Sequence, residues 1–289
     1  MQRIKKIFKI VKNEFIFGGH LLSLGGASIA YTASILLNIE ITWDFLLIVY
    51  LAFQSAYLFN RYKEIEKDSL TNPERTVHLE KYYKKIPFII LLFLLIFFLI
   101  QLYFHKIPAL IFSSFVVVLG FLYSIFFKTL TRKIIALKDI FVSLLWALVI
   151  VFFTLYYSHP LDLSIFILFV FIFLRWIVNT SFFDIKDIKS DSEEHLLTLA
   201  VVLGKERLIS LLSLITIFAI LPIIFGIYLN IIPMISVFLL LTVPYTYYYL
   251  KLSRSAKINT AFLYNVIVDG EFLLWPIFIL IGKLLYGRI

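Results

Sequence analysis

The amino-acid sequence predicts an all-α integral membrane protein, and three observations support this fold class. Hydrophobic residues make up 62% of the 289 residues, and the mean hydropathy is +0.97, whereas soluble domains are roughly half apolar. The apolar residues occur in runs long enough to cross a hydrocarbon layer, which needs about 20 helical residues. The basic residues gather between alternate runs. A soluble globular core is therefore excluded.

Nine apolar runs are predicted to form membrane-spanning helices of a single domain over residues 1–289. The basic residues before the first run precede a full span with no small-residue cleavage site, so this run is predicted to be a start-transfer anchor and not a removable signal peptide. In chain order the predicted spans are Phe15–Leu37, Trp43–Phe59, Ile86–Phe104, Ala109–Phe127, Ile140–Tyr157, Leu161–Phe183, Leu208–Leu229, Ile231–Tyr249 and Thr260–Leu285.

The distribution of Lys and Arg predicts the orientation of the bundle. Segments 1–14, 60–85, 128–139, 184–207 and 250–259 hold 5, 7, 4, 4 and 3 of these residues, which is 23 of the 27 in the chain. Short loops rich in Lys and Arg face the cytoplasm, so we expect the N-terminus on that side, in the cell membrane. The net charge of +9 is therefore explained by topology and does not indicate nucleic-acid binding.

A weak internal repeat predicts a site between two halves of the bundle. The second and sixth predicted helices both run into acidic cytoplasmic segments, and the fourth and eighth both end in Tyr and Lys, at Tyr123 with Lys128 and at Tyr245 with Lys251. Weak repeats of this kind occur in membrane proteins with a central binding site. We expect a central cavity open to the cytoplasmic side and capped by segments 60–85 and 184–207.

The two acidic segments predict a metal site. On a helix of 3.6 residues per turn, each segment places three oxygen-bearing side chains on one face. Like charges four residues apart destabilise a helix, and a bound cation removes this penalty. Mg²⁺ takes oxygen ligands and is typically shared between carboxylates and substrate phosphates. We therefore expect two Mg²⁺ ions around a diphosphate, although each segment alone also fits an ordinary solvated charged face. The candidate ligands are Asn60, Glu64 and Asp68 in the first segment, and Asp184, Asp187 and Asp191 in the second.

These segments resemble the two signatures of the UbiA superfamily of intramembrane prenyltransferases. Its members carry an Asn-x-x-x-Asp-x-x-x-Asp segment after helix 2 and an Asp-rich segment after helix 6 of a nine-helix bundle. The first segment continues into Asn72-Pro73-Glu74-Arg75, and the second into Thr198-Leu199 and Gly204-Lys205, as in the family. Gly120 to Ser124 with Lys128 resembles the Tyr-Ser and Lys element after helix 4. This sequence departs from the family pattern at Arg61, Glu64, His195 and Ala200.

The resemblance implies transfer of a polyprenyl group from an allylic prenyl diphosphate to a lipophilic or aromatic acceptor, as in quinone or isoprenoid-lipid biosynthesis. It also implies Mg²⁺ as the cofactor. Preorganised cations stabilise a developing diphosphate charge. The candidates for binding the diphosphate are Arg61, Arg75, Tyr123 and Lys128. A transporter of an anionic lipid or metabolite and a non-catalytic membrane scaffold remain alternatives, but a transporter has little reason to carry six oxygen ligands in two cytoplasmic segments.

Four polar residues are candidates for the acceptor side of the site. Ionisable groups at membrane depth usually face a cavity or one another, so Arg175 is predicted either to pair with Asp269 or Glu271 or to orient the acceptor. His20 and Gln54 lie in the first two predicted helices, and close helix packing explains them equally well. The first helix has no counterpart of the Arg that aromatic-acid members carry, so we expect a lipophilic acceptor in preference to a free benzoate. The four candidates are His20, Gln54, Arg175 and Asp269.

Overall fold

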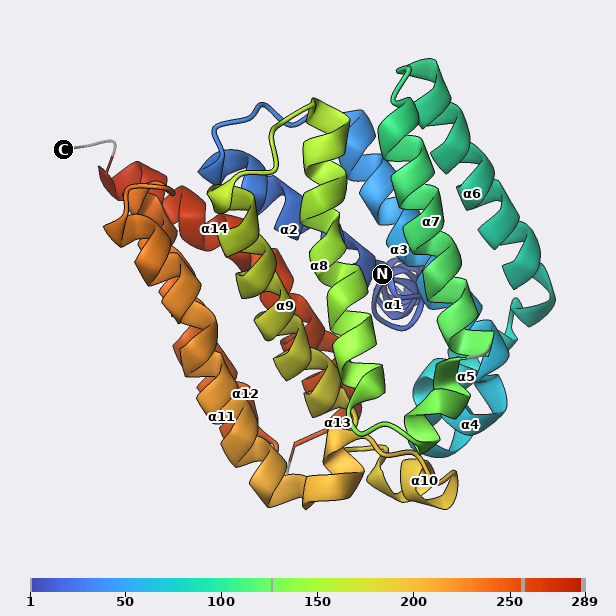
Figure 1. Ribbon diagram of the computed structural model, residues 1–289. Helices are drawn as coiled ribbons and strands as arrows, with labels where there is room; N and C mark the ends of the chain where they lie inside the picture. The colour runs from blue at the N-terminus through green and yellow to red at the C-terminus, as the bar shows by residue number, and fades with distance from the viewer. Residues whose placement is uncertain (1, 126, 256–257, 287–289) are drawn as a thin grey trace.

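The computed structural model describes residues 2–125, 127–255 and 258–286, and the side chains of residues 2–6, 70 and 127–129 lie outside this description. Within these ranges the protein is helical and contains no strand (Figure 1). The first half consists of α1 (Gln2–Phe17), α2 (His20–Leu36), α3 (Trp43–Lys63), α4 (Ile65–Thr71), α5 (Pro73–Glu80), η1 (Tyr83–Lys85), α6 (Ile86–Tyr103), α7 (Ile107–Ile125) and η2 (Phe127–Arg132). The second half consists of α8 (Leu137–Tyr157), α9 (Leu163–Phe183), α10 (Ile188–Glu193), α11 (Leu199–Tyr228), η3 (Met234–Leu241), α12 (Thr242–Leu252), α13 (Thr260–Phe262), the π-helical η4 (Leu263–Val268) and α14 (Asp269–Tyr286).

Seven helical segments in the described chain are long and apolar enough to cross a membrane. They are Tyr83–Tyr103, Ile107–Ile125, Leu137–Tyr157, Leu163–Phe183, Leu199–Tyr228, Met234–Leu252 and Thr260–Tyr286. The apolar helix α2 has 17 residues, and α3 has 21 residues but is more polar. Large apolar side chains are exposed on the outer faces of α6, α7 and α11, as expected where helices meet lipid; examples are Phe88, Leu91, Ile111, Phe115 and Phe218. The protein is therefore a multi-pass membrane protein.

The first predicted span, Phe15–Leu37, is wrong as a single helix. The chain breaks between α1 and α2 at Gly18 and Gly19, and Gly19 has a φ of 87°. Glycine adopts this left-handed conformation without steric cost, and a Cβ at Gly19 would lie only 2.3 Å from the ring of Tyr57. As a result α1 runs across the bundle, and Figure 1 shows it nearly end-on while the long helices extend along the page.

The seventh predicted span also begins earlier than expected, at Leu199 instead of Leu208. Gly204, with a φ of 71°, interrupts the helical dihedrals inside α11. The residues of α11 before Gly204 therefore form a separate helical turn, which follows the second acidic segment in the chain. The two predicted capping segments are largely helical, because α4 and α5 lie in the first and α10 lies in the second. Figure 1 places α4, α5 and α10 together at one end of the bundle.

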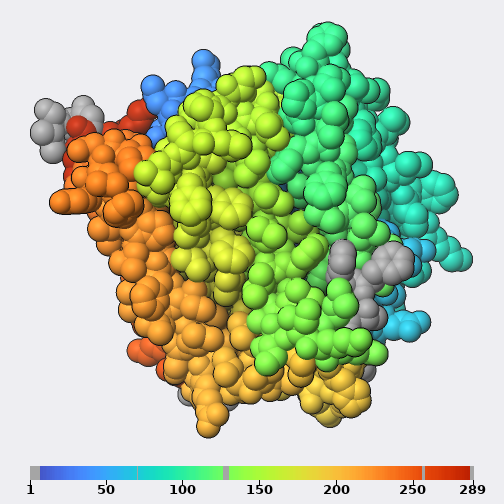
Figure 2. Space-filling view, in the orientation of Figure 1, coloured from blue at the N-terminus to red at the C-terminus, as the bar shows by residue number. Residues whose placement is uncertain are grey.

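Stacked aromatic rings fix the helices around the centre of the molecule. The ring of Trp146 on α8 lies 3.7 Å from Phe53 on α3 and 3.6 Å from Trp176 on α9, with small interplanar angles. Trp176 stacks in turn on Phe272 of α14 at 4.3 Å. Burial of such large rings contributes strongly to the free energy of packing. One continuous column of rings thereby joins four helices. On the surface of the molecule, Figure 2 shows that side chains fill the spaces between α7, α8, α9 and α11.

Helices α9 and α14 pack antiparallel. Near the middle of α9, the ring of Phe171 lies 4.9 Å from Trp275 of α14. At the C-terminal end of α9, Phe183 lies 5.3 Å from Tyr264, which precedes α14. The two helices therefore run in opposite directions. These contacts determine which residues of α9 lie beside which residues of α14 at the same height in the bundle.

Candidate active site

Both acidic segments line one cavity of about 320 Å³. The polar end is formed where α3 continues into α4 and where α9 continues into α10. The other end, towards the middle of the bundle, is lined by apolar and aromatic side chains that include Phe53, Phe112, Val117, Trp146, Phe152 and Trp176. A polar mouth joined to an apolar interior fits a ligand with a charged head and a hydrocarbon tail.

The first segment keeps its three candidate ligands on one face although the helix is interrupted. Glu64 lies between α3 and α4 with a non-helical φ of −109°. Its backbone N–H still donates to the Asn60 carbonyl at 3.0 Å, and the N–H of Asp68 donates to the Glu64 carbonyl at 2.9 Å. These i to i+4 bonds preserve the helical spacing across the break. Asn60, Glu64 and Asp68 consequently all line the cavity.

The second segment is also held by backbone hydrogen bonds. Asp184 follows α9, and the N–H of Asp187 donates to its carbonyl at 3.1 Å. The N–H of Asp191 then donates to the Asp187 carbonyl at 2.8 Å. All three aspartates line the cavity. The structure thus brings the six predicted ligands, which come from two distant parts of the chain, to the same space.

The residues present fit a divalent cation. Asp184 Oδ2, Asp187 Oδ1 and Asp191 Oδ2 are buried and have no hydrogen-bond partner within the described chain. A buried acceptor without a partner costs about 1–3 kcal/mol, and more when it is charged. In the described part of the chain, no three Asp, Glu or His side chains converge closely enough to hold an ion by themselves. Substrate oxygens would therefore have to complete the coordination, as is usual for Mg²⁺.

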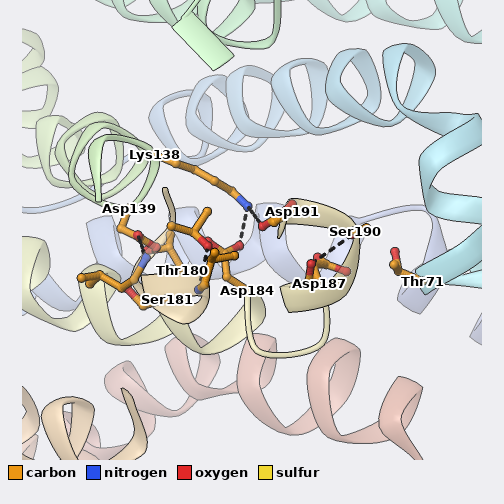
Figure 3. A network of polar contacts seen from close by, with 12 residues as sticks. Thr71, Lys138, Asp139, Thr180, Ser181, Asp184, Asp187, Ser190 and Asp191 are labelled. Carbon is orange, nitrogen blue, oxygen red and sulfur yellow. Dashed lines mark hydrogen bonds and ion pairs between the residues drawn. The ribbon is translucent and has the colours of Figure 1, made fainter. Parts of the chain in front are cut away.

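Two lysines not predicted from the sequence lie between the acidic side chains, and Figure 3 shows one of them, Lys138, beside Asp184 and Asp191. Lys138 at the start of α8 contacts Asp184 and lies 3.9 Å from Asp191. Lys67 on α4 donates to Asp191 at 2.7 Å and so joins the first segment directly to the second. Burial raises the pKa of Asp184 well above its usual range although Lys138 lies against it. The sequence signal for Lys138 was its position beside the start of a predicted span.

Asp68 is held by two arginines. Its carboxylate accepts hydrogen bonds from Arg75 at 2.8 Å and from Arg61 at 3.2 and 3.3 Å. Burial opposes ionisation, but the nearby Arg61 and Arg75 outweigh it and lower the pKa of Asp68. Arg75 is 2% exposed, and both guanidinium groups reach the cavity wall. Asp68 thereby fixes two cations beside the remaining carboxylates.

Lys186, in the turn between α9 and α10, is a third cation that sequence reasoning did not single out. It lines the cavity and donates a hydrogen bond to Asn72. Its amine also lies 5.4 Å from the ring centres of both Phe183 and Tyr264. Burial, and then the charge of Arg75, lower the pKa of Lys186 to about 7. The polar end of the cavity therefore contains a cation whose charge is easily lost.

Of the four predicted diphosphate-binding residues, Arg61, Arg75 and Tyr123 line the cavity. The ring of Tyr123 stacks on Phe141 at 5.3 Å, which fixes its orientation. Lys128 belongs to η2, but its side chain lies outside the described part of the chain.

Of the four acceptor-side candidates, Asp269 alone is among the residues that line the cavity. Gln54 donates to the Gly18 carbonyl at 2.7 Å and accepts from Ser23 at 2.6 Å, so it holds α2 against α3. His20 contacts Tyr50 and lies 3.3 Å from Glu14.

The expected ion pair within the bundle is present. Arg175 Nε donates to Glu271 at 3.1 Å, and the same guanidinium group also contacts Thr246. Arg175 and Glu271 are each 1% exposed. Arg175 thus joins α9 to both α12 and α14. The ion pair agrees with the predicted alternative in which Arg175 pairs with an acidic residue, and the partner is Glu271.

Comparison with known proteins gives one family and two related folds. The family described as UbiA prenyltransferase family matches residues 21–275. The apo structure of a UbiA homolog from Aeropyrum pernix K1 has a TM-score of 0.69 and 14% identity, covering 92% of this chain and 98% of that one. A digeranylgeranylglyceryl phosphate synthase has a TM-score of 0.57 and 16% identity, covering 99% and 98%. At these identities the two structures establish the fold alone. No curated protein sequence matches the chain significantly.

Proposed function

The chain belongs to the UbiA prenyltransferase family, and on this premise we propose that it transfers a polyprenyl group from an allylic diphosphate to a lipophilic acceptor in a Mg²⁺-dependent reaction. The observation that carries the proposal is the meeting of both acidic segments at the polar end of one cavity whose interior is apolar. A diphosphate head and a hydrocarbon tail match these two environments.

We place nine helices in the membrane by adding α2 and α3 to the seven segments that meet the length and hydropathy criteria. The Lys and Arg distribution then orients the acidic end of the cavity towards the cytoplasm. A charged donor made in the cytoplasm would enter from that side, and its tail would extend between the helices.

The six oxygen-bearing residues would hold two Mg²⁺ ions. Glu64 has a longer side chain than the usual aspartate but carries the same carboxylate. Arg61 and Arg75, positioned by Asp68, would bind diphosphate oxygens as Arg forks do. Lys67 and Lys138 occupy positions between the acidic side chains, and they would turn to the diphosphate when the metal ions take the carboxylates.

The proposed chemistry is departure of the diphosphate followed by capture of an allylic cation. Bound Mg²⁺ supplies Lewis-acid stabilisation of the leaving group, typically several kcal/mol. The arginines provide further fixed positive charge beside the departing oxygens. The apolar lining of the cavity would disfavour water, which otherwise competes with the acceptor.

A lipid acceptor is compatible with the apolar cavity. One structure with a similar fold belongs to a digeranylgeranylglyceryl phosphate synthase. In the described part of this chain, the intramembrane cation Arg175 is bonded to Glu271 and is therefore not available for an acceptor carboxylate. Both observations favour a lipophilic acceptor over a free benzoate.

The test is to supply purified protein with radiolabelled geranylgeranyl diphosphate and a membrane lipid extract. We expect a labelled lipid product with Mg²⁺ and none with excess EDTA. Asp187→Asn should lower the rate by at least about tenfold, because it removes one metal ligand. Glu206→Gln is the matched control, since this exposed carboxylate forms only a surface pair with Arg254, and it should leave the rate unchanged. Full turnover in EDTA would contradict the proposal.

A further inference from the structure

Two buried polar side chains line the cavity outside the acidic segments, and the proposed prenyl transfer has not yet used either of them. Asn179 on α9 is 2% exposed, Asp269 in the first turn of α14 is 8% exposed, and both line the cavity. Within the described chain, Asn179 Nδ2 and Asp269 Oδ1 have no hydrogen-bond partner. One atom is a donor and the other an acceptor. Native proteins pair most such atoms in the interior, and because both residues line the cavity, a ligand bound there can supply both partners.

The antiparallel packing of α9 and α14 puts these two side chains at the same level. Trp176 stacks on Phe272. Asn179 lies three residues after Trp176, and Asp269 lies three residues before Phe272, so each is one helical turn from the stacked pair on the side of the acidic end. Asn179 is also five residues before Asp184, or roughly 7.5 Å along the helix axis at 1.5 Å per residue. The first carbons of a prenyl chain whose diphosphate lies on the aspartates would reach this level.

Two features of α14 fix the position of Asp269. The π-helical turn Leu263–Val268 comes directly before it, and such turns shift the following side chains around the helix and are frequent at functional sites. Two residues later, Glu271 is bonded to Arg175 on α9. Glu271 points away from the cavity lining and is paired, whereas Asp269 reaches the cavity with one oxygen unpaired.

We propose that Asn179 and Asp269 form the acceptor subsite and that it binds a neutral hydroxyl group of an alcohol or a phenol. The inference rests on the proposed prenyl transfer. A hydroxyl group both donates and accepts, so it donates to Asp269 Oδ1 while it accepts from Asn179 Nδ2. A carboxylate in this position has no proton to donate, so Asp269 Oδ1 would stay unpaired. The subsite therefore selects hydroxyl acceptors and rejects acids.

In the reaction Asp269 takes the acceptor proton. The bond between the allylic C1 and the diphosphate oxygen breaks, and the electron pair leaves with the diphosphate. The acceptor hydroxyl oxygen forms a bond to C1, and its proton goes to the Asp269 carboxylate. The proton passes to water when the product leaves. Asp269 is thus the general base of the transfer, and Asn179 positions the hydroxyl group.

The binding test uses two probes that differ only in the hydroxyl group, an octyl bromophenol and its methyl ether. Bromine quenches tryptophan fluorescence, and Trp146 and Trp176 line the cavity. We expect the unsubstituted protein to bind the phenol about tenfold more tightly than the ether, because the ether cannot donate. Asp269→Asn and Asn179→Leu should each reduce this preference to about threefold or less. An undiminished preference in both variants would overturn the subsite.

The turnover test separates the two steps of the reaction. Asp269→Asn should lower transfer to a long-chain alcohol by about 100-fold or more, as expected when a general base is lost. Its affinity for geranylgeranyl thiodiphosphate, a slowly ionising donor analogue, should stay unchanged. Asn179→Leu should raise KM for the alcohol more than it lowers kcat, and Glu206→Gln should change neither value. Parallel loss of donor affinity in Asp269→Asn would overturn the subsite, because the residue would then support only the donor site.

These results distinguish the subsite from the proposed function. If the unsubstituted protein releases no diphosphate from any allylic donor, prenyl transfer itself fails, whatever the phenol titration gives. A second outcome is that the unsubstituted protein does release diphosphate, and that both variants transfer the prenyl group to the alcohol with the same kcat/KM as the unsubstituted protein. In that case the subsite fails and prenyl transfer stands.

Discussion

At the scale of single residues, the site is a set of carboxylates held apart by lysines and arginines. Asp191 contacts Lys67, Asp184 contacts Lys138, and Asp68 contacts Arg61 and Arg75. Like charges concentrated in a low-dielectric cavity repel one another strongly, so the cations stabilise the site before any metal binds. The protein would thus exchange internal ion pairs for metal ions and diphosphate when the donor enters.

Glu64 provides the clearest test of a single ligand, because aspartate is usual at this position in the family. Glu64→Asp keeps the carboxylate and should retain or improve the rate of prenyl transfer. Glu64→Gln keeps the size but removes the charge, and it should lower the rate by at least about tenfold. Steady-state rates at saturating donor and varied Mg²⁺ measure this difference. Equal rates for the Gln variant and the unsubstituted protein would remove Glu64 from the ligand set.

The sequence predicted the six acidic-segment residues and the two arginines beside Asp68, but not the lysines beside the other carboxylates. Carboxylates spaced at three or four residues on a helix carry a recognisable pattern, and both segments follow it. Lys138 and Lys186 show no such spacing, because each reaches its partner through the packing of α8 or of the turn after α9. Asn179 carries no charge and was not singled out. The proposed role of Asn179 depends on its lying at the same height in the bundle as Asp269. Only the packing of α9 against α14 determines this position.

At the scale of elements, the junction between α1 and α2 departs most from the sequence prediction. The hydropathy pattern predicted one helix from Phe15 to Leu37, because a pair of glycines in an apolar run is also compatible with close packing in a membrane helix. The structure instead uses Gly19 to turn the chain. Polar contacts then hold α1, because Glu14 accepts hydrogen bonds from Tyr82 at 3.1 Å and contacts His78 at 2.7 Å. Hydrogen bonds to His20 and His78 lower the pKa of Glu14 to about 2.

Gly19→Ala should destabilise the protein. A side chain with a φ of 87° costs about 1–2 kcal/mol, and the added Cβ would lie 2.3 Å from the Tyr57 ring, which adds about 1–3 kcal/mol of overpacking. The measurement is the thermal unfolding midpoint in detergent, which should fall by several degrees.

Gly270→Ala is the matched control. This glycine lies in α14 without a positive φ, and no atom of the described protein lies within 4 Å of an added Cβ. Alanine is the better helix former by up to about 1 kcal/mol, so the midpoint should stay or rise. A Gly19→Ala midpoint equal to that of the unsubstituted protein would show that the α1–α2 turn does not require glycine.

At the scale of the whole molecule, the fold class was predictable because it depends on composition and long apolar runs. The positions of the acidic segments after the second and sixth predicted spans also indicated that they meet, since both were assigned to the same side. The cavity itself was not predictable in detail. Its walls depend on the column of rings from Phe53 through Trp146 and Trp176 to Phe272, and 31 Phe in a membrane protein give no sign of which ones line a cavity.

The central claim is that the two acidic segments together hold one metal–diphosphate group, and electron paramagnetic resonance of bound Mn²⁺ tests it most directly. With geranylgeranyl thiodiphosphate present, the protein should bind roughly two Mn²⁺ that show hyperfine coupling to ³¹P. Glu64→Gln in the first segment and Asp187→Asn in the second should each reduce the bound Mn²⁺ and the coupling, while Glu206→Gln should leave both unchanged. If either site variant retains the full Mn²⁺ stoichiometry and the ³¹P coupling of the unsubstituted protein, the segments do not share the diphosphate and the account is wrong.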